Sequence, residues 1–345
     1  MTQALSESRP AAVVQTDAAD QASYIAHVWY DRIFFIFSPL IALALGGILS
    51  LTPWAVQKYS LYNRPESAVS LFSGVFTMAH LVIVFFRSHG NPGILRRHPV
   101  RFWAAPVLLF GAMMLSSWVL VFVFVLAVWW DVYHSSLQTF GLGRLYDVRS
   151  GALSDKTRAL DRGLNIVLYL GPVLGGAVMM DHVRHFDKFK EVGSAFFSVI
   201  PAWAGSHHGA LTAVVLAAGA AYLVYYLWSY ARLICEGHPV SRQKVILFVS
   251  TGICSVTAWG FNSFGQAFFI MNFFHALQYF ALIWHAEKRT VRFWPVLVGA
   301  GFGYGVWAKF LGESSHAAMS LLLTVSILHF WYDGFIWSVR RSPAA

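Results

Sequence analysis

Four histidines of this sequence lie inside long apolar stretches, where a polar ring is costly to bury. They are His80, His134, His275 and His329. Ionisable side chains within membrane segments are rare and usually functional, and neutral imidazole is a common ligand of iron, copper and zinc. We therefore predict that the four histidines bind a metal ion. Few carboxylates and no thiolates accompany them, so iron or copper is favoured over a structural zinc site.

Polar side chains accompany three of these histidines at helical spacing. Each lies three or four residues from a histidine, which places both on one face of a helix. These companions are Asp131 and Gln138 around His134, Gln278 after His275, and Asp333 after His329. Carboxylates and amides commonly fix the tautomer of a metal-bound histidine, so we predict that the four companions orient the rings or complete the ligand set. His285, further along the chain from His275, is an additional candidate ligand, with which the site could hold two ions.

The composition predicts the elements that must position these side chains. The chain of 345 residues is 57% hydrophobic and 12% charged, whereas soluble domains carry about 25% charged residues. We predict an all-α, polytopic transmembrane helical bundle with about 8–10 spans. The net charge is +9, but the basic residues lie in short clusters between apolar runs. The charge therefore indicates membrane topology and excludes nucleic acid as a partner.

Ten apolar segments approach or reach the length of about 20 residues that a membrane span needs. They are 30–52, 66–87, 102–116, 117–141, 160–181, 209–233, 243–262, 264–286, 292–311 and 315–338. The division at Ser116 and Ser117 predicts a tight hairpin. We expect a flexible polar tail over residues 1–29, a single transmembrane domain over 30–341, and a loop outside the cytoplasm over 182–208.

Basic residues follow every second one of these segments, as at Arg96 and Arg97 or at Lys288 and Arg289. Because short basic loops stay in the cytoplasm, we predict two cytoplasmic termini and a multi-pass protein of the bacterial inner membrane. At a rise of about 1.5 Å per residue, the four histidines lie about 10 to 17 Å from the cytoplasmic ends of their helices. They share one layer of the membrane, which favours a common site.

The histidines belong to four short motifs that follow one another along the chain. These are Met78-Ala-His80, His134 with its polar neighbours, Phe274-His275, and Leu328-His329-Phe-Trp-Tyr-Asp333-Gly-Phe-Ile-Trp337. Their order resembles the bacterial Brp/Blh group of membrane β-carotene dioxygenases. The chain has Thr77-Met78-Ala79-His80 where that group has Gly-x-Pro-His-Gly, and His275-Ala-Leu-Gln278 where it has His-x-x-x-His. The resemblance implies a membrane-embedded non-haem iron site that faces hydrophobic substrates, and it does not extend to the identity of the substrate.

The leading hypothesis is a membrane oxygenase or oxidoreductase that uses non-haem iron. Its substrate would be a hydrophobic lipid or isoprenoid that enters from the bilayer, and an electron donor would be a further partner. Copper in place of iron, or a haem-binding electron-transfer protein, is the second hypothesis, because histidines on facing helices also suit axial ligation. The third is a transporter or proton relay lined by His and Asp, which predicts polar groups across the full thickness of the membrane.

Overall fold

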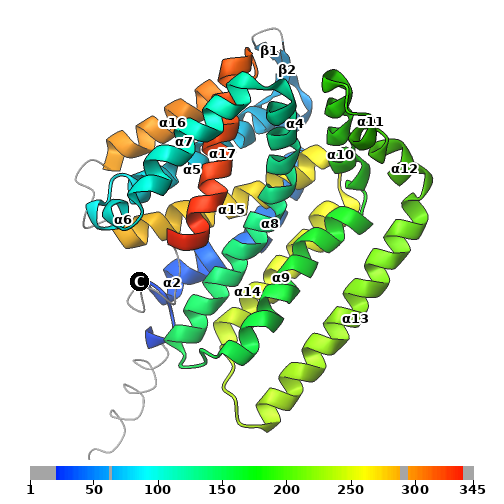
Figure 1. The fold of residues 1–345 in the computed structure, drawn as a ribbon. Helices are drawn as coiled ribbons and strands as arrows, with labels where there is room; N and C mark the ends of the chain where they lie inside the picture. Colours follow the sequence, from blue (N-terminus) through cyan, green and yellow to red (C-terminus); the bar gives the residue numbers. More distant parts are fainter. Residues whose placement is uncertain (1–20, 62–63, 288–293, 337–345) are drawn as a thin grey trace, which may run out of the picture.

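The computed structural model describes residues 21–61, 64–287 and 294–336. This part of the chain is almost entirely helical, and its strands are confined to one hairpin, β1 (Lys58–Leu61) and β2 (Arg64–Ser67), which pair antiparallel. The elements form one helical bundle (Figure 1). The predicted all-α membrane bundle is thus confirmed as a fold class.

Among the described residues, six helices are long and apolar enough to cross a membrane. They are α5 (Ala68–Ser88), α8 (Ser117–Arg149), α13 (His208–Cys235), α14 (Arg242–Phe261), α15 (Phe264–Glu287) and α17 (His316–Ile336). Two bent pairs raise the number of spans to eight if each pair counts as one. The first pair is Val28–Ile36 with Ser38–Ser50, bent by 56°, and the second is Asp155–Gly175 with Met179–Val192, bent by 91°. The multi-pass character of the chain follows from these lengths and compositions.

The remaining elements are shorter or join the long helices. They are α2 (Val28–Asp31), η1 (Arg32–Ile36), α3 (Ser38–Ser50), α4 (Pro53–Val56), α6 (Pro92–Arg97), α7 (Pro99–Leu115), α9 (Asp155–Gly175), α10 (Met179–Val183), η2 (Arg184–Val192), α11 (Ala195–Ser198), α12 (Ile200–Ser206) and α16 (Trp294–Leu311). Each of the ten predicted apolar segments falls on one to three of the helices of the described chain. The predicted loop 182–208 consists mainly of short helices.

Two long apolar stretches are each interrupted by a break between helices. Ser116 has an extended backbone, ends α7 and caps α8 by accepting the N–H of Val119, so the predicted division of 102–141 is observed. The predicted segment 160–181, by contrast, is not one helix. At Gly176 a Cβ atom would lie 2.6 Å from the Cα of Gly260, and the chain turns there because the α14 backbone approaches so closely.

The end of the predicted N-terminal tail packs against the bundle. Tyr24 and Ile25 are buried, and the carboxylate of Asp31 accepts hydrogen bonds from the backbone N–H groups of Ile25, Ala26 and His27. Tyr146 of α8 donates its hydroxyl to the same carboxylate at 3.0 Å. Residues 1–20 of the predicted tail lie outside the described residues.

A fully buried charge network joins α8, α9 and α14 at one end of the bundle. Lys244 lies between Asp147 and Asp161, with its Nζ 2.8 and 3.0 Å from their carboxylates. Arg144 pairs with Asp147 at 2.9 Å, so two positive and two negative charges balance. Tyr230 brings in α13, because its hydroxyl donates to Asp161 and accepts from Lys244. Buried charges are tolerated when they are paired in this way.

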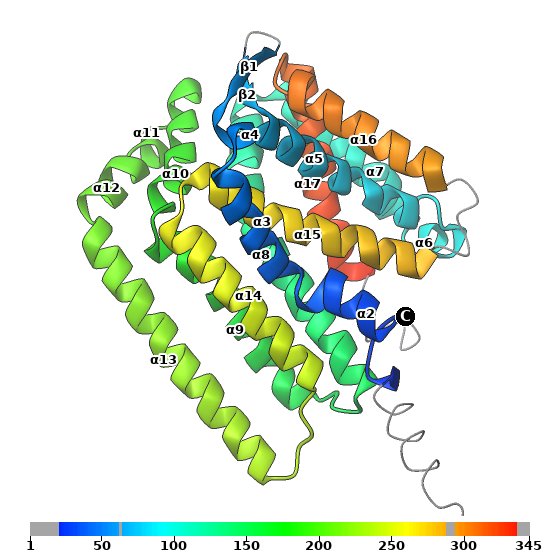
Figure 2. The same cartoon turned by 180° about the vertical axis from the view of Figure 1, so that it is seen from behind.

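Helix α13 lies at the edge of the bundle beside α9 (Figures 1 and 2). None of the residues in its most apolar window is buried, and Leu216, Leu223 and Trp228 are among its exposed side chains. An apolar surface of this kind suits contact with lipid tails. The packed part of the bundle therefore consists of the other long helices.

Helix α16 packs closely on α5, the helix that carries His80. A Cβ atom on Gly305 would collide with the carbonyl oxygen of Val75, and one on Gly301 would lie 2.9 Å from Ile83. Small residues allow two helix backbones to approach each other in this way. The glycines of α16 therefore fix the position of α5.

We predict that Gly305→Val destabilises the protein by about 1–3 kcal/mol, because the added side chain must push α16 away from α5. Gly303→Val is the matched control, since no atom lies within 4 Å of the position where its Cβ would stand. The thermal unfolding midpoint of the detergent-solubilised protein measures both effects. Equal midpoints for the two variants would contradict the close α5–α16 contact.

Candidate metal centre

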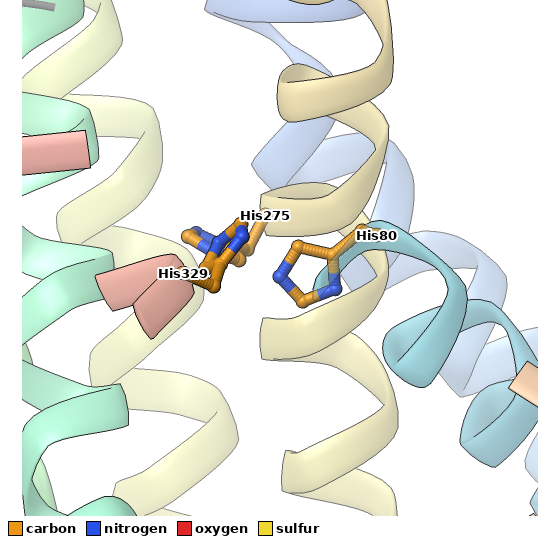
Figure 3. Close-up of side chains that lie close together, drawn as sticks. All are labelled: His80, His275 and His329. Atoms are coloured by element: carbon orange, nitrogen blue, oxygen red, sulfur yellow. The ribbon is translucent and has the colours of Figure 1, made fainter. Parts of the chain in front are cut away.

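The four predicted histidines meet in the interior of the bundle, one each from α5, α8, α15 and α17. The ring of His80 lies 5.1 Å from that of His275 and 4.9 Å from that of His329, between ring centroids. The ring of His134 lies 5.1 and 4.9 Å from the same two rings. The four imidazoles therefore form a closed circle of edge-to-face contacts. Figure 3 shows three of them pointing toward one another.

All four rings are removed from the surface of the protein. Their residues are between 0% and 3% exposed. Aromatic side chains contact them, including Phe330, whose ring lies 4.9 Å from His134, and Tyr279, whose ring lies 4.9 Å from His329. Each of the four helices therefore buries a polar ring. An apolar side chain of similar size would fill the same space with a smaller desolvation penalty.

The hydrogen bonds of two histidines fix which ring nitrogen is free. The Nδ1 atom of His80 contacts the carbonyl oxygen of Thr77, and the Nδ1 atom of His329 lies 3.1 Å from the carbonyl oxygen of Leu81. A carbonyl oxygen only accepts, so Nδ1 carries the proton in both rings. The Nε2 atoms consequently present lone pairs. Neither Nε2 has a hydrogen-bond partner among the described residues.

The other two histidines leave further nitrogens without a partner. The Nε2 atom of His134 and both ring nitrogens of His275 are buried and form no hydrogen bond to any described residue. Leaving one buried polar group unsatisfied costs about 1–3 kcal/mol. A metal ion removes this cost for one nitrogen of each ring, because it accepts the lone pair that no donor meets. The cluster fits a metal centre better than a hydrogen-bonded packing network.

The spacing of the ring nitrogens is close to that of metal ligands. One ligand atom each from His80, His275 and His329 can be chosen so that all lie within 4.8 Å of one another. Nitrogens on one ion at bonds of about 2.1 Å lie at most about 4.2 Å apart. Small adjustments of the rings therefore bring these atoms to ligand distance.

Asp333 brings a carboxylate to the same cluster. Its Oδ2 atom lies 3.7 Å from the Nε2 of His329 and 3.8 Å from the Nε2 of His134. These three residues form a second group whose ligand atoms all lie within 4.8 Å of one another. The Oδ1 atom accepts a hydrogen bond of 2.9 Å from the hydroxyl of Tyr279. The structure thus places Asp333 where the sequence predicts it.

The two glutamines lie beside the cluster, but they act on the backbone and not on the rings. Gln138 donates to the carbonyl oxygen of His275 at 3.0 Å and to the side chain of Gln278 at 3.1 Å. Gln278 in turn donates to the carbonyl oxygen of Phe35 and to Ser38. They hold α15 against α8 and the first bent pair of helices. Neither amide nitrogen donates to an imidazole ring, and the Oε1 atom of Gln138 is buried without a hydrogen-bond partner among the described residues.

Two predicted site residues are not part of the cluster. No hydrogen bond or ion pair joins Asp131 to any of the four histidines in the part of the chain that the structure describes. His285 lies with its ring 6.4 Å from that of Tyr30. It follows His275 by almost three turns, so about 15 Å of helix separates the two residues. Asp131 and His285 each lie on the same helix as one of the four histidines, but outside the cluster.

Two residues of the site were missed by the sequence prediction. Tyr279 touches the rings of His80 and His329, with centroids 6.0 and 4.9 Å apart, and binds Asp333. Thr77 supplies the carbonyl group that fixes the tautomer of His80. Tyr279 follows His275 by four residues and Thr77 precedes His80 by three, so same-face spacing was the signal that could have found both.

Comparison of the chain with protein-family models, with curated proteins and with solved structures finds no match. The fold and the site therefore define the class of the protein by themselves. It is a multi-pass helical membrane protein with a buried cluster of four histidines and one carboxylate.

We predict that His275→Leu leaves the thermal midpoint of chelator-treated protein unchanged or raises it, because it removes two unpartnered nitrogens. His89→Leu is the matched control. Both ring nitrogens of His89 have partners, Ser88 at 2.9 Å and the carbonyl oxygen of Phe102 at 3.1 Å. That variant should lose about 1–3 kcal/mol. A loss of the same size in His275→Leu would assign the histidines to packing.

Proposed function

We propose that this protein is a metal-dependent membrane oxidoreductase, of the oxygenase type, with a non-haem iron at the histidine cluster. His80, His134, His275 and His329 would be the protein ligands, and Asp333 would complete the set. The observation that carries the proposal is the clustering of buried, unpartnered ring nitrogens between four helices, in two groups of possible ligands that share His329.

The donor set favours non-haem iron. Histidines together with one carboxylate are typical ligands of non-haem iron in oxygenases, whereas imidazoles alone also suit copper. Each ring contacts two of the others edge to face, at 4.9 to 5.1 Å between centroids, so a flat macrocycle placed between any two rings would collide with the others. This spacing counts against the alternative of a haem held between the same histidines.

The surroundings of the cluster favour an apolar substrate. Iron held by histidine and carboxylate supplies dioxygen chemistry when it is bound. The four rings are buried, and Phe330 packs against those of His134 and His329. Asp333, held by Tyr279, is the acidic group at the cluster and can accept a proton from a reacting substrate. A lipid or isoprenoid from the bilayer, with an external electron donor, fits this environment.

The resemblance to the Brp/Blh dioxygenases supports the same chemical class. It rests on the motifs around His80, His134, His275 and His329, which are also the four histidines of the cluster. Two cytoplasmic termini and a location in the bacterial inner membrane belong to this proposal, since they follow from the basic loops alone.

We predict near-stoichiometric iron in protein purified in detergent without chelators, and no Soret band in its optical spectrum. The double variant His134→Ala with His329→Ala should lose the iron. His207→Ala is the control, because this exposed ring stacks on Trp203 far along the chain from the cluster motifs. Elemental analysis and the spectrum provide the measurement. Iron retained in the double variant, or metal-free wild-type protein, would refute the proposal.

We predict that Tyr279→Phe lowers the affinity for iron by about 10–100-fold, because Asp333 loses the hydroxyl group that orients it. Competition with a coloured chelator measures this affinity. Tyr169→Phe is the control, since this buried hydroxyl contacts Thr139 and not the cluster. An unchanged affinity in Tyr279→Phe would show that Asp333 does not bind the ion.

A further inference from the structure

A cavity of about 580 Å³ lies at the N-terminal ends of α5 and α15. Its walls come from α3, α4, α5, α15 and α16, which are neighbours in the bundle (Figure 2). A volume in this range is typical of pockets that bind small molecules. None of the four histidines or Asp333 lines it, so the cavity is separate from the candidate metal centre.

The first turns of two helices line this cavity. Val69 and Ser70 belong to the first turn of α5, and Gly265 and Gln266 to the first turn of α15, and all four line the cavity. The first N–H groups of a helix have no partner within the helix, and they carry a positive partial charge. Ser67 satisfies the N–H of Ser70. The others remain available to a ligand that accepts hydrogen bonds.

Ser73 provides an independent indication of a ligand. It lines the cavity and is 7% exposed, and its hydroxyl forms no hydrogen bond to any residue that the structure describes. A serine in a helix usually donates to a carbonyl group of the preceding turn. A hydroxyl left free at the wall of a cavity is suited to bind an occupant of that cavity.

A lysine adds a positive charge to the same wall. Lys309 of α16 lies across Gly74, where a Cβ atom would stand 2.7 Å from its Cδ. Its ammonium group pairs with Glu66 at 2.7 Å and has two further N–H groups. The absence of a side chain at Gly74 lets the lysine reach the cavity. The free groups at this end of the cavity are therefore mainly donors.

Other residues of the lining are apolar. Leu49, Val56, Phe268 and Phe269 contribute to its lining. A ligand that satisfies both parts carries an oxyanion at one end and a hydrocarbon chain at the other. We infer that this cavity binds the phosphate or carboxylate group of an anionic amphiphile, with its chain against these apolar side chains.

The cavity and the metal centre share two helices. Ser73 precedes His80 by seven residues and Phe268 precedes His275 by seven, so about 10 Å of helix separates the cavity wall from each histidine. The binding inference does not depend on the metal, because none of the residues that carry it is a proposed ligand. It can therefore hold or fail independently of the proposed function.

Equilibrium binding of dodecyl phosphate to the detergent-purified full-length chain tests the inference, with protein-free micelles as the blank. We expect saturable binding that weakens about tenfold or more in Ser73→Ala, the loss expected for one hydrogen bond to a charged group. The double variant Glu66→Gln with Lys309→Gln, which keeps a neutral pair, should weaken binding similarly. Ser255→Ala is the matched control, because it also removes a buried, unpartnered hydroxyl but one outside the cavity.

Two further probes separate the sources of the binding energy. Dodecanol has the same chain without the charge and should bind at least tenfold more weakly than dodecyl phosphate. Inorganic phosphate that competes with dodecyl phosphate would identify a site for the free anion, and failure to compete would show that the chain is required. Both results agree with an oxyanion site. Dodecanol binding as tightly as dodecyl phosphate, or binding that is unaffected by Ser73→Ala and by the double variant, would overturn the inference.

Discussion

The cost of burying a polar nitrogen without a partner is the constraint on which this structure depends. Four helices each direct one imidazole to the same point, and His80, His134, His275 and His329 leave five ring nitrogens unsatisfied there among the described residues. At about 1–3 kcal/mol for each such group, the total rivals the stability of a typical domain. An arrangement of this kind is stable when an ion meets the lone pairs. The packing of the surrounding helices serves to hold the rings in place.

The bundle contains a second buried polar cluster, and the contrast between the two is informative. Around Lys244 the charges balance, and Asp147, Asp161 and Tyr230 surround the ammonium group at 2.8 to 3.0 Å. That network is satisfied by the protein itself and ties α8, α9, α13 and α14 together. The histidine cluster lacks such closure. We therefore assign a structural role to the first cluster and ligand binding to the second, although both are fully buried.

The clustering of the four histidines could be predicted from sequence, because each lies in an apolar segment and all four have similar distances to the predicted ends of their helices. Asp333 was also within reach, since it follows His329 by one turn. The same spacing rule failed for Gln138 and Gln278. A spacing of three or four residues places two side chains on one face of a helix. It does not show whether they contact an imidazole ring or a backbone carbonyl group of the facing helix. The break at Gly176 likewise depends on the α14 backbone, which no local pattern reveals.

The histidines come from the second, fourth, eighth and tenth apolar segments, so an ion at this point joins parts of the chain that are far apart in sequence. No pair of them lies on the same helix, and each helix therefore reaches its ligand position through tertiary packing. The four rings are held in position by contacts such as Gly305 against α5 and Gln138 against α15. An ion at the proposed centre would bind only to the assembled bundle, so its binding free energy would add to the stability of the bundle. Metal binding and helix assembly would then be coupled.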